Sequence, residues 1–252
     1  MKHYIFLPIA LAVVTATLLF SSCTISLNKD TIEPGEMTKE TRNLGAFNQI
    51  HVGGAMSIEF VTSDSSYIEI ETGKNILPHI KTEVNDSILK IMPAPKEDKP
   101  FYSSNERTFH FQPTLDNCDI KVKIFAPSLK DIDLSGATNF KADNITNDNI
   151  VIQLSGATAA DIKNLTCKNV KIDATGASKI TIKVNGADNT EVEATGACKA
   201  DITFNNCNRT GINVAGAASM KLKGTLNTLD KHIAGACSLD TNELKLTNNN
   251  NQ

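Results

Sequence analysis

The sequence predicts an all-β parallel β-helix, or β-solenoid, in which each turn, or rung, takes about 20 residues. The main observation is a Gly-Ala pair that recurs through residues 132–246, with an alternating apolar and polar run on each side of it. A fixed period of this length indicates a stacked repeat, and it is too short for a propeller blade or a helix pair. The repeated glycines lie 20, 20, 20, 20 and 19 residues apart: Gly136, Gly156, Gly176, Gly196, Gly216 and Gly235.

Each repeat contains two predicted strands. The run before the glycine alternates, as in Ile172-Asp173-Ala174, which is typical of a strand with one buried face. The run after the glycine places apolar residues four and six positions on, as in Ile180 and Ile182. Asn-rich segments close each unit, and we expect Asn and Gly to occupy corners with positive φ. Successive rungs should stack about 4.8 Å apart, in a right-handed coil.

The glycine column has a backbone explanation. If every rung bends at the same place, a Cβ there would clash or φ would be positive, and only glycine fits. We therefore interpret these glycines as structural corner residues. A phosphate-binding loop is disfavoured, because no Lys-Ser/Thr follows and no helix is indicated.

The first 22 residues have the pattern of a targeting segment. Lys2 is followed by an apolar run from Ile5 to Phe20, which is short for a membrane span. The run ends at Ser21-Ser22-Cys23, which resembles a bacterial lipobox and implies cleavage before Cys23 and lipidation of its thiol. We expect an exported protein anchored to the membrane by this lipid, in the cell envelope at the outer membrane. Which side of that membrane it faces is left open. An uncleaved anchor helix is the alternative.

The segments between the signal peptide and the regular repeats are less uniform. Residues 23–43 are polar and predict a flexible tether. Residues 44–128 contain short alternating strands and predict either the first rungs of the solenoid or a cap on it. Within them, residues 93–117 are rich in proline and predict a loop that leaves the stack. The regular solenoid should cover residues 129–246, followed by a disordered tail at 247–252.

Three stretches carry a resemblance to a known family. They are Phe47–Gly54, Asn75–Ile80 and the Ser-Gly-Ala repeats. Together they resemble the DUF2807 family, described as a putative autotransporter adhesin, head GIN domain, and common among Bacteroidetes lipoproteins. The resemblance covers about residues 44–246 and implies a binding or adhesive role.

Two sets of side chains are candidates for a binding face. Asp133, Asp173 and Glu193 occupy the position three before the glycine and should line one outer face. Such a column resembles the calcium-binding cleft of parallel β-helix polysaccharide lyases, and carboxylates gathered in this way can bind calcium or act as acid and base. The simpler interpretation is that outward positions of a strand are polar. Phe101 and Tyr102 lie in the loop and could contact a glycan or protein ligand.

The cysteines and the charged columns indicate structural roles. Cys167 and Cys207 fall in one column two rungs apart, as do Cys198 and Cys237. A separation of about 9.6 Å exceeds the reach of a disulfide, so we expect free thiols that fill the core. No zinc-type spacing is present in the sequence. One column is expected to place Lys141 over Asp161 and Asp201 over Lys221 as opposite-charge pairs. Cys118 falls in no column.

The composition limits the classes of function. A net charge of −3 and a pI near 6.0 do not indicate nucleic-acid binding. The histidines have no Ser or Cys at the spacing of a catalytic triad. The sequence favours a non-enzymatic envelope lipoprotein that acts as an adhesin or binding module, without a cofactor. One alternative is a polysaccharide-binding or polysaccharide-degrading enzyme, and another is a periplasmic structural or assembly protein that forms a homo-oligomer.

Overall fold

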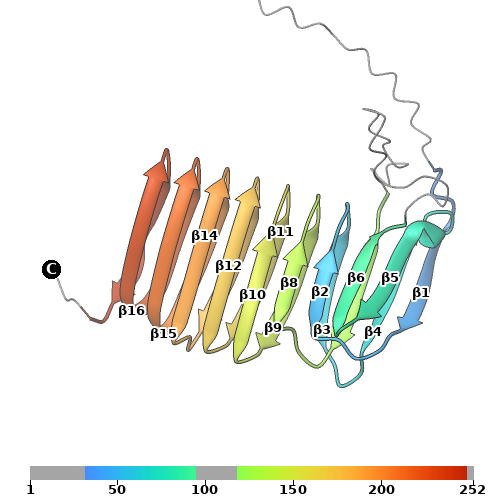
Figure 1. Cartoon of the computed structure of the whole chain (residues 1–252), viewed down its shortest axis with the longest axis horizontal. Coiled ribbons are helices and arrows are strands. Elements are labelled where there is room, and N and C mark those ends of the chain that lie inside the picture. The colour runs from blue at the N-terminus through green and yellow to red at the C-terminus, as the bar shows by residue number, and fades with distance from the viewer. Residues whose placement is uncertain (1–31, 95–117, 249–252) are drawn as a thin grey trace, which may run out of the picture.

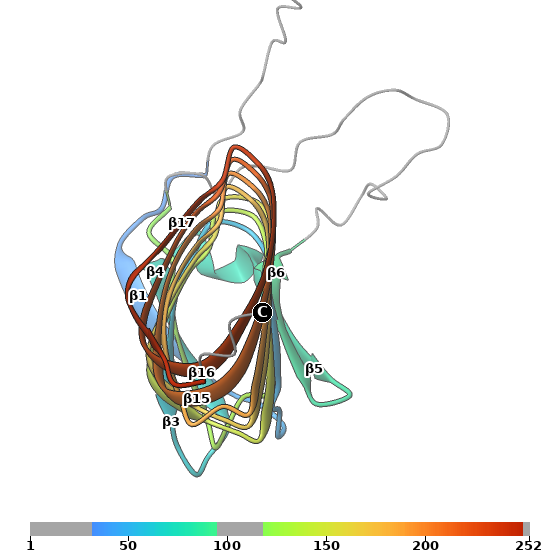
Figure 2. The same ribbon diagram turned by 90° about the vertical axis from the view of Figure 1, so that its left-hand side faces the viewer.

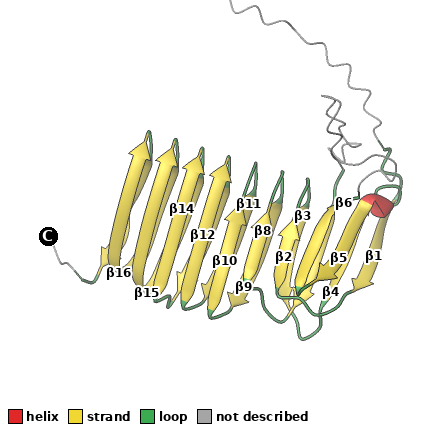
Figure 3. Cartoon of the chain, viewed as in Figure 1, coloured by secondary structure: helices red, strands yellow, loops and turns green. Residues whose placement is uncertain are grey.

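The structure is a computed structural model that describes residues 32–94 and 118–248. It confirms an all-β solenoid with rungs of about 20 residues, whose strands stack side by side along one axis (Figures 1 and 3). Seen along that axis, the coil is a flattened oval with two long sides (Figure 2). Within the described ranges the one helical element is a short 3-10 turn, η1 (Leu77–His79), and no helix is long and apolar enough to span a membrane.

The two long sides hold different strands of each rung. Face A, as we call it, holds the strands that precede each repeated glycine, and face B holds the strands that follow it. Face A comprises β2 (Gln49–Val52), β8 (Asp131–Leu134), β10 (Asn149–Leu154), β12 (Asn169–Gly176), β14 (Asn189–Gly196) and the second halves of β15 (Lys199–Gly216) and β16 (Ser219–Gly235). Face B comprises β3 (Ser57–Thr62), β9 (Asn139–Thr146), β11 (Ala159–Thr166), β13 (Lys179–Asn185), the first halves of β15 and β16, and β17 (Ser238–Leu246).

The order of the strands in space differs from their order in the chain at the N-terminal end. β6 (Ile88–Pro93) and β7 (Lys121–Ala126) pair in parallel with β2 and β3, so the β2–β3 rung lies between β6–β7 and β8–β9. Beyond them, β4 (Tyr67–Gly73) pairs antiparallel with β7, and β5 (Ile80–Asn85) pairs antiparallel with β6. These antiparallel strands cap the stack, as the end of a solenoid requires. The predicted N-terminal β region therefore supplies both rungs and a cap.

The predicted tether is wrong over its last residues. Met37–Asn43 forms β1, which pairs antiparallel with β4. The guanidinium of Arg42 fastens it to the cap by donating to the carbonyl oxygen of Ile80 at 2.7 Å and to Oγ1 of Thr82 at 3.0 Å. At the other end, the backbone N–H groups of Thr247 and Asn248 bond to the preceding rung, so the stack continues two residues into the predicted tail. Cys23, Phe101 and Tyr102 lie outside the described residues.

Apolar columns fill the narrow space between the two faces. Ile132, Ile152 and Ile172 pair in register on adjacent strands and are 0% exposed. The predicted inward and outward alternation is therefore confirmed. The same column ends at Lys231, which pairs with Ile212 on the last rung. A charged side chain at an inward position protects an edge strand from pairing with other chains.

The structure confirms both explanations of the glycine column. All six repeated glycines have positive φ, between +80° and +107°. A Cβ added at any of them would come within 2.5–2.8 Å of the carbonyl oxygen of the glycine on the preceding rung. That oxygen accepts a hydrogen bond from the alanine after the glycine, as from Ala177 to Gly156 at 2.8 Å. The backbones of successive corners therefore pack directly on one another.

The asparagines have a different role from the predicted one. Asn206 is the one asparagine with positive φ among the residues that the structure describes. Nine of the others stack in register, where the amide nitrogen of one side chain donates to the amide oxygen of the next, as from Asn164 to Asn144 at 3.3 Å. Asparagine is favoured at these places because its amide both donates and accepts.

Cys167, Cys198, Cys207 and Cys237 are free thiols, as predicted. Cys167, Cys198 and Cys207 are buried, whereas Cys118 and Cys237 are half-buried. Burial raises the pKa of Cys167 to about 12 and raises that of Cys207 as well. Cys198 and Cys237 also act as donors that close the corner, because each Sγ approaches the carbonyl oxygen three residues earlier.

Candidate functional site

The acidic column lies where the sequence predicts it, on the outer surface of face A. Asp173 and Glu193 are paired on adjacent strands, and Gln153 separates Asp173 from Asp133. Oδ2 of Asp173 lies 3.6 Å from Nζ of Lys171. Within residues 32–94 and 118–248, no three His, Cys, Asp or Glu side chains gather in a way that could hold a metal ion.

A groove runs beside this column, closer to the corner where each rung enters face A. Its volume is about 690 Å³, and it crosses six successive strands, β2, β8, β10, β12, β14 and β15. Stacked amides form one wall, where Nδ2 of Asn169 donates to Oδ1 of Asn149 at 2.8 Å and Nδ2 of Asn189 donates to Oδ1 of Asn169 at 3.0 Å. The remaining lining includes Asp131, Val151, Lys171, Glu191, Arg209 and Gly211.

Asp131 is the most perturbed carboxylate of this groove. Burial raises the pKa of its carboxyl group, and the nearby His51 lowers that pKa by less. Nε2 of His51 lies 4.0 Å from Oδ1 of Asp131, beyond hydrogen-bonding distance. Oδ1 is buried and has no hydrogen-bond partner among the described residues. An acceptor in this state favours a ligand that brings a donor.

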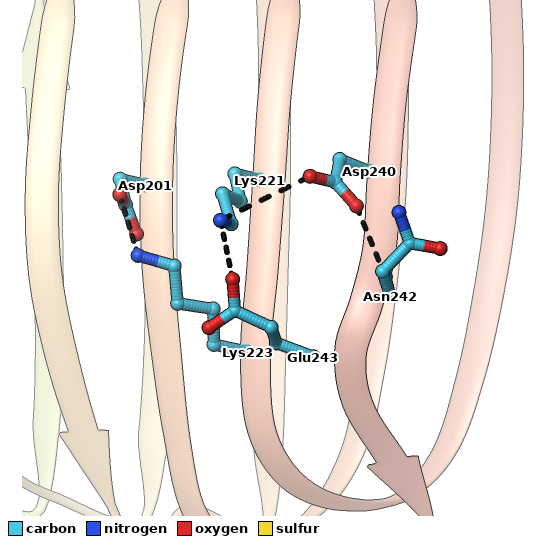
Figure 4. A network of polar contacts seen from close by, with 6 residues as sticks. All are labelled: Asp201, Lys221, Lys223, Asp240, Asn242 and Glu243. Atoms are coloured by element: carbon cyan, nitrogen blue, oxygen red, sulfur yellow. Dashed lines mark hydrogen bonds and ion pairs between the residues drawn. The ribbon is translucent and has the colours of Figure 1, made fainter.

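Face B carries ion pairs near the C-terminal end of the stack (Figure 4). The predicted column is in register, since Asp201 pairs with Lys221 and Lys141 pairs with Asp161. The expected contact between Asp201 and Lys221 is not made, because Nζ of Lys223 binds Oδ2 of Asp201 at 2.9 Å.

Lys221 instead bonds to the carboxylate of Glu243 and lies 4.0 Å from that of Asp240, and both carboxylates raise its pKa, Glu243 by more. A bulge in β17, which shifts the register between Lys221 and Lys223, brings Glu243 within reach. The pairs Asp201–Lys223 and Lys221–Glu243 are therefore displaced by one outward position along the strand, whereas Lys221 and Asp240 remain in register.

The comparison with known families decides the family. The model of DUF2807, "Putative auto-transporter adhesin, head GIN domain", matches residues 46–186, more than half of the 252-residue chain. The chain belongs to the DUF2807 family. No curated protein sequence matches it.

Several solved structures are similar to this DUF2807 chain, and two of them are crystal structures of putative adhesins. A putative adhesin from Bacteroides fragilis NCTC 9343 is 23% identical, with a TM-score of 0.58, over 82% of this chain and 99% of that one. A putative adhesin from Parabacteroides distasonis ATCC 8503 is 18% identical, with a TM-score of 0.47, over 82% of this chain and 97% of that one. The first likeness shows that the two proteins share the solenoid fold.

A second groove of the DUF2807 chain lies on face B and has a volume of about 630 Å³. Its charged side chains largely neutralise one another. Lys39 binds Glu69 at 2.9 Å, and Lys123 binds Glu59 at 3.0 Å. Exposed pairs of this kind contribute little to stability and mainly fix the positions of long side chains. The groove on face A keeps more of its hydrogen-bonding capacity free.

The sequence analysis missed most of the residues that line the groove on face A. It considered the carboxylates that lie three residues before each repeated glycine. The groove is lined instead by residues that lie five and seven positions before these glycines. Asn149, Asn169 and Asn189 recur at a spacing of 20 residues. That spacing was a signal that could have found the amide wall. Asp131 carried no such signal, because its burial depends on the neighbouring rung that contains His51.

Proposed function

We propose that this DUF2807 chain is a non-enzymatic adhesin-type binding module of the cell envelope. The observation that carries the proposal is the groove of face A, which crosses six strands and is lined by side chains in fixed register. Sites built on strands hold their side chains more exactly in place than sites on loops. A surface of this kind suits an extended ligand. The family and the adhesin from Bacteroides fragilis support the same role.

The proposal includes attachment to the outer membrane through a lipid on Cys23. Ser21-Ser22-Cys23 after an apolar run supports it, as does the polar segment that separates the cysteine from β1 at Met37. A lipid anchor at one end of a rigid rod holds its long faces away from the membrane surface. Such display serves adhesion.

The experiment compares a deletion strain with strains complemented by the wild-type chain or by Cys23→Ala. We measure partition of the chain between membrane and soluble fractions and retention of cells on surfaces coated with mucin, collagen or albumin. The wild-type chain should enter the membrane fraction and restore retention on mucin or collagen. Cys23→Ala should be soluble and should not restore retention. Equal retention of all strains on every coating would contradict the binding role, and membrane partition of Cys23→Ala would contradict the lipid anchor.

A further inference from the structure

The stacked amides of the face A groove have unused hydrogen-bonding capacity. An amide has two N–H donors and two acceptor lone pairs on its oxygen. In the ladder, Asn169 uses one donor toward Asn149 and one lone pair toward Asn189. A donor and an acceptor therefore remain at each step, and the steps recur about every 4.8 Å along the solenoid axis. Arg209 continues the same column beyond Asn189 and adds a planar set of donors.

One buried polar group of the lining lacks a partner among the residues that the structure describes. It is Oδ1 of Asp131, whose side chain lies on the outer side of β8. A buried polar group without a partner is costly, and in a native protein it calls for a specific explanation. This oxygen can accept a hydrogen bond, so a hydroxyl group of a ligand would satisfy it.

Gly211 is a third independent feature of the groove. It lies in the interior of β15, between Glu191 and Asp230 of the neighbouring rungs. Unlike the corner glycines, it does not have positive φ, and a Cβ there would meet no described atom within 4 Å. Backbone geometry therefore does not require glycine at this position. A glycine inside a strand often marks the close approach of a ligand.

From these features we propose that the groove of face A binds one extended glycan chain that lies along the solenoid axis, across the rungs. This inference rests on the proposed binding function and names the ligand class for it. Six strands give five spacings, so the groove spans about 24 Å. Neighbouring hydroxyls of a sugar both donate and accept, so they match the amide edges, the Asp131 carboxylate and the Arg209 guanidinium.

Other ligand classes fit the groove less well. A phosphate or sulfate brings no donor for Oδ1 of Asp131 and would also face the carboxylate of Glu191. An extended peptide is usually bound by strand addition at a sheet edge with free backbone groups, whereas these strands are paired on both sides. An amphipathic helix needs an apolar groove, and the lining here is mostly amide and charge.

The test uses the purified full chain on an array of unbranched oligosaccharides long enough to fill the groove. The array holds β-1,4-linked glucose, xylose, mannose and galacturonate, together with α-linked glucose. Gly211→Thr places a branched side chain in the groove where a strand accepts one readily. Asn164→Ala is the matched control, because it breaks an equivalent amide pair on face B, outside the groove. Thermal unfolding is measured for each variant.

The wild-type chain should bind at least one glycan of the array. Gly211→Thr should bind it about tenfold or more weakly with an unchanged or higher melting temperature, and Asn164→Ala should bind as the wild type does. The proposal is overturned if the wild type binds no glycan, if Gly211→Thr keeps full affinity, or if Asn164→Ala weakens binding equally. Failure to bind glycans, together with reduced retention of the deletion strain on mucin or collagen, would leave the binding function standing without the glycan.

Discussion

Three glycines of neighbouring rungs offer a direct test of why the corner column is glycine. Gly176 has φ +80°, and a Cβ there would lie 2.8 Å from the carbonyl oxygen of Gly156. Gly186 has φ +67°, but a Cβ there would meet no described atom within 4 Å. Gly211 has neither a positive φ nor a close neighbour among the described residues. Replacing each by alanine therefore separates backbone strain from steric contact.

The expected changes in the free energy of unfolding follow from these geometries. Left-handed backbone costs an L-residue about 1–2 kcal/mol, which is the whole effect expected for Gly186→Ala. Gly176→Ala adds displacement of the Gly156 carbonyl, which weakens the bond from Ala177 by about 0.5–1.5 kcal/mol. Its total is therefore about 1.5–3.5 kcal/mol. Gly211→Ala should stabilise by about 0.4–1 kcal/mol, because it reduces the freedom of the unfolded chain.

The assay is urea unfolding followed by far-ultraviolet circular dichroism, supported by melting temperatures. For a folded region of this size, 1 kcal/mol corresponds to about 2–4 °C. From the most to the least stable, the order should be Gly211→Ala, wild type, Gly186→Ala and then Gly176→Ala. Equal losses for Gly176→Ala and Gly186→Ala would refute the role of the contact between corners. A loss for Gly211→Ala would refute the argument that its backbone does not need glycine.

Four further predictions concern the amide ladder, the thiols and the open edge. Asn169→Ala removes two exposed amide bonds and should lower the free energy of unfolding by about 0.5–1.5 kcal/mol, measured by urea unfolding. Because the pKa of Cys167 is raised, its contribution to the free energy of unfolding is complete below about pH 9 and falls as the pH rises toward 12. Cys167→Ala should therefore make the free energy of unfolding depend less on pH over that range. At pH 8, iodoacetamide should modify Cys237 in the folded chain and reach Cys167 only after denaturation, as mass spectrometry would show. Lys231→Ile restores the apolar column at the last rung and should cause association that increases with concentration in light scattering, whereas a monodisperse variant would contradict this role.

Much of the fold could be predicted because it depends on local sequence patterns that recur in every rung. The glycine period sets the length of the rung, and the alternation around Ile172 assigns the inward face. The N-terminal arrangement could not be predicted in the same way. Insertion of the β2–β3 rung between β6–β7 and β8–β9 depends on pairings between distant segments. Met37–Asn43 is polar, so backbone pairing with β4 makes it a strand without any hydrophobic pattern.

The candidate site was predicted only in part, for a related reason. The outward direction of Asp173 follows from the strand period, whereas its neighbours across the face depend on how the rungs are stacked. The hydrogen bonds of Asn169 and the burial of Asp131 arise from residues on other rungs. The unusual freedom at Gly211 can be recognised only beside the crowded corner glycines. The sequence alone does not distinguish Gly211 from the corner glycines.

The most direct test of the account is whether the solenoid is displayed outside the cell. Intact cells are treated with a membrane-impermeant, amine-reactive biotin, and lysed cells serve as the control. Lys179 and Lys199 are exposed on face B, so a displayed solenoid presents amines to the reagent without any need for unfolding. We predict that the chain is labelled equally on intact and lysed cells. Labelling that occurs only after lysis would place the chain inside the envelope and contradict an adhesive role.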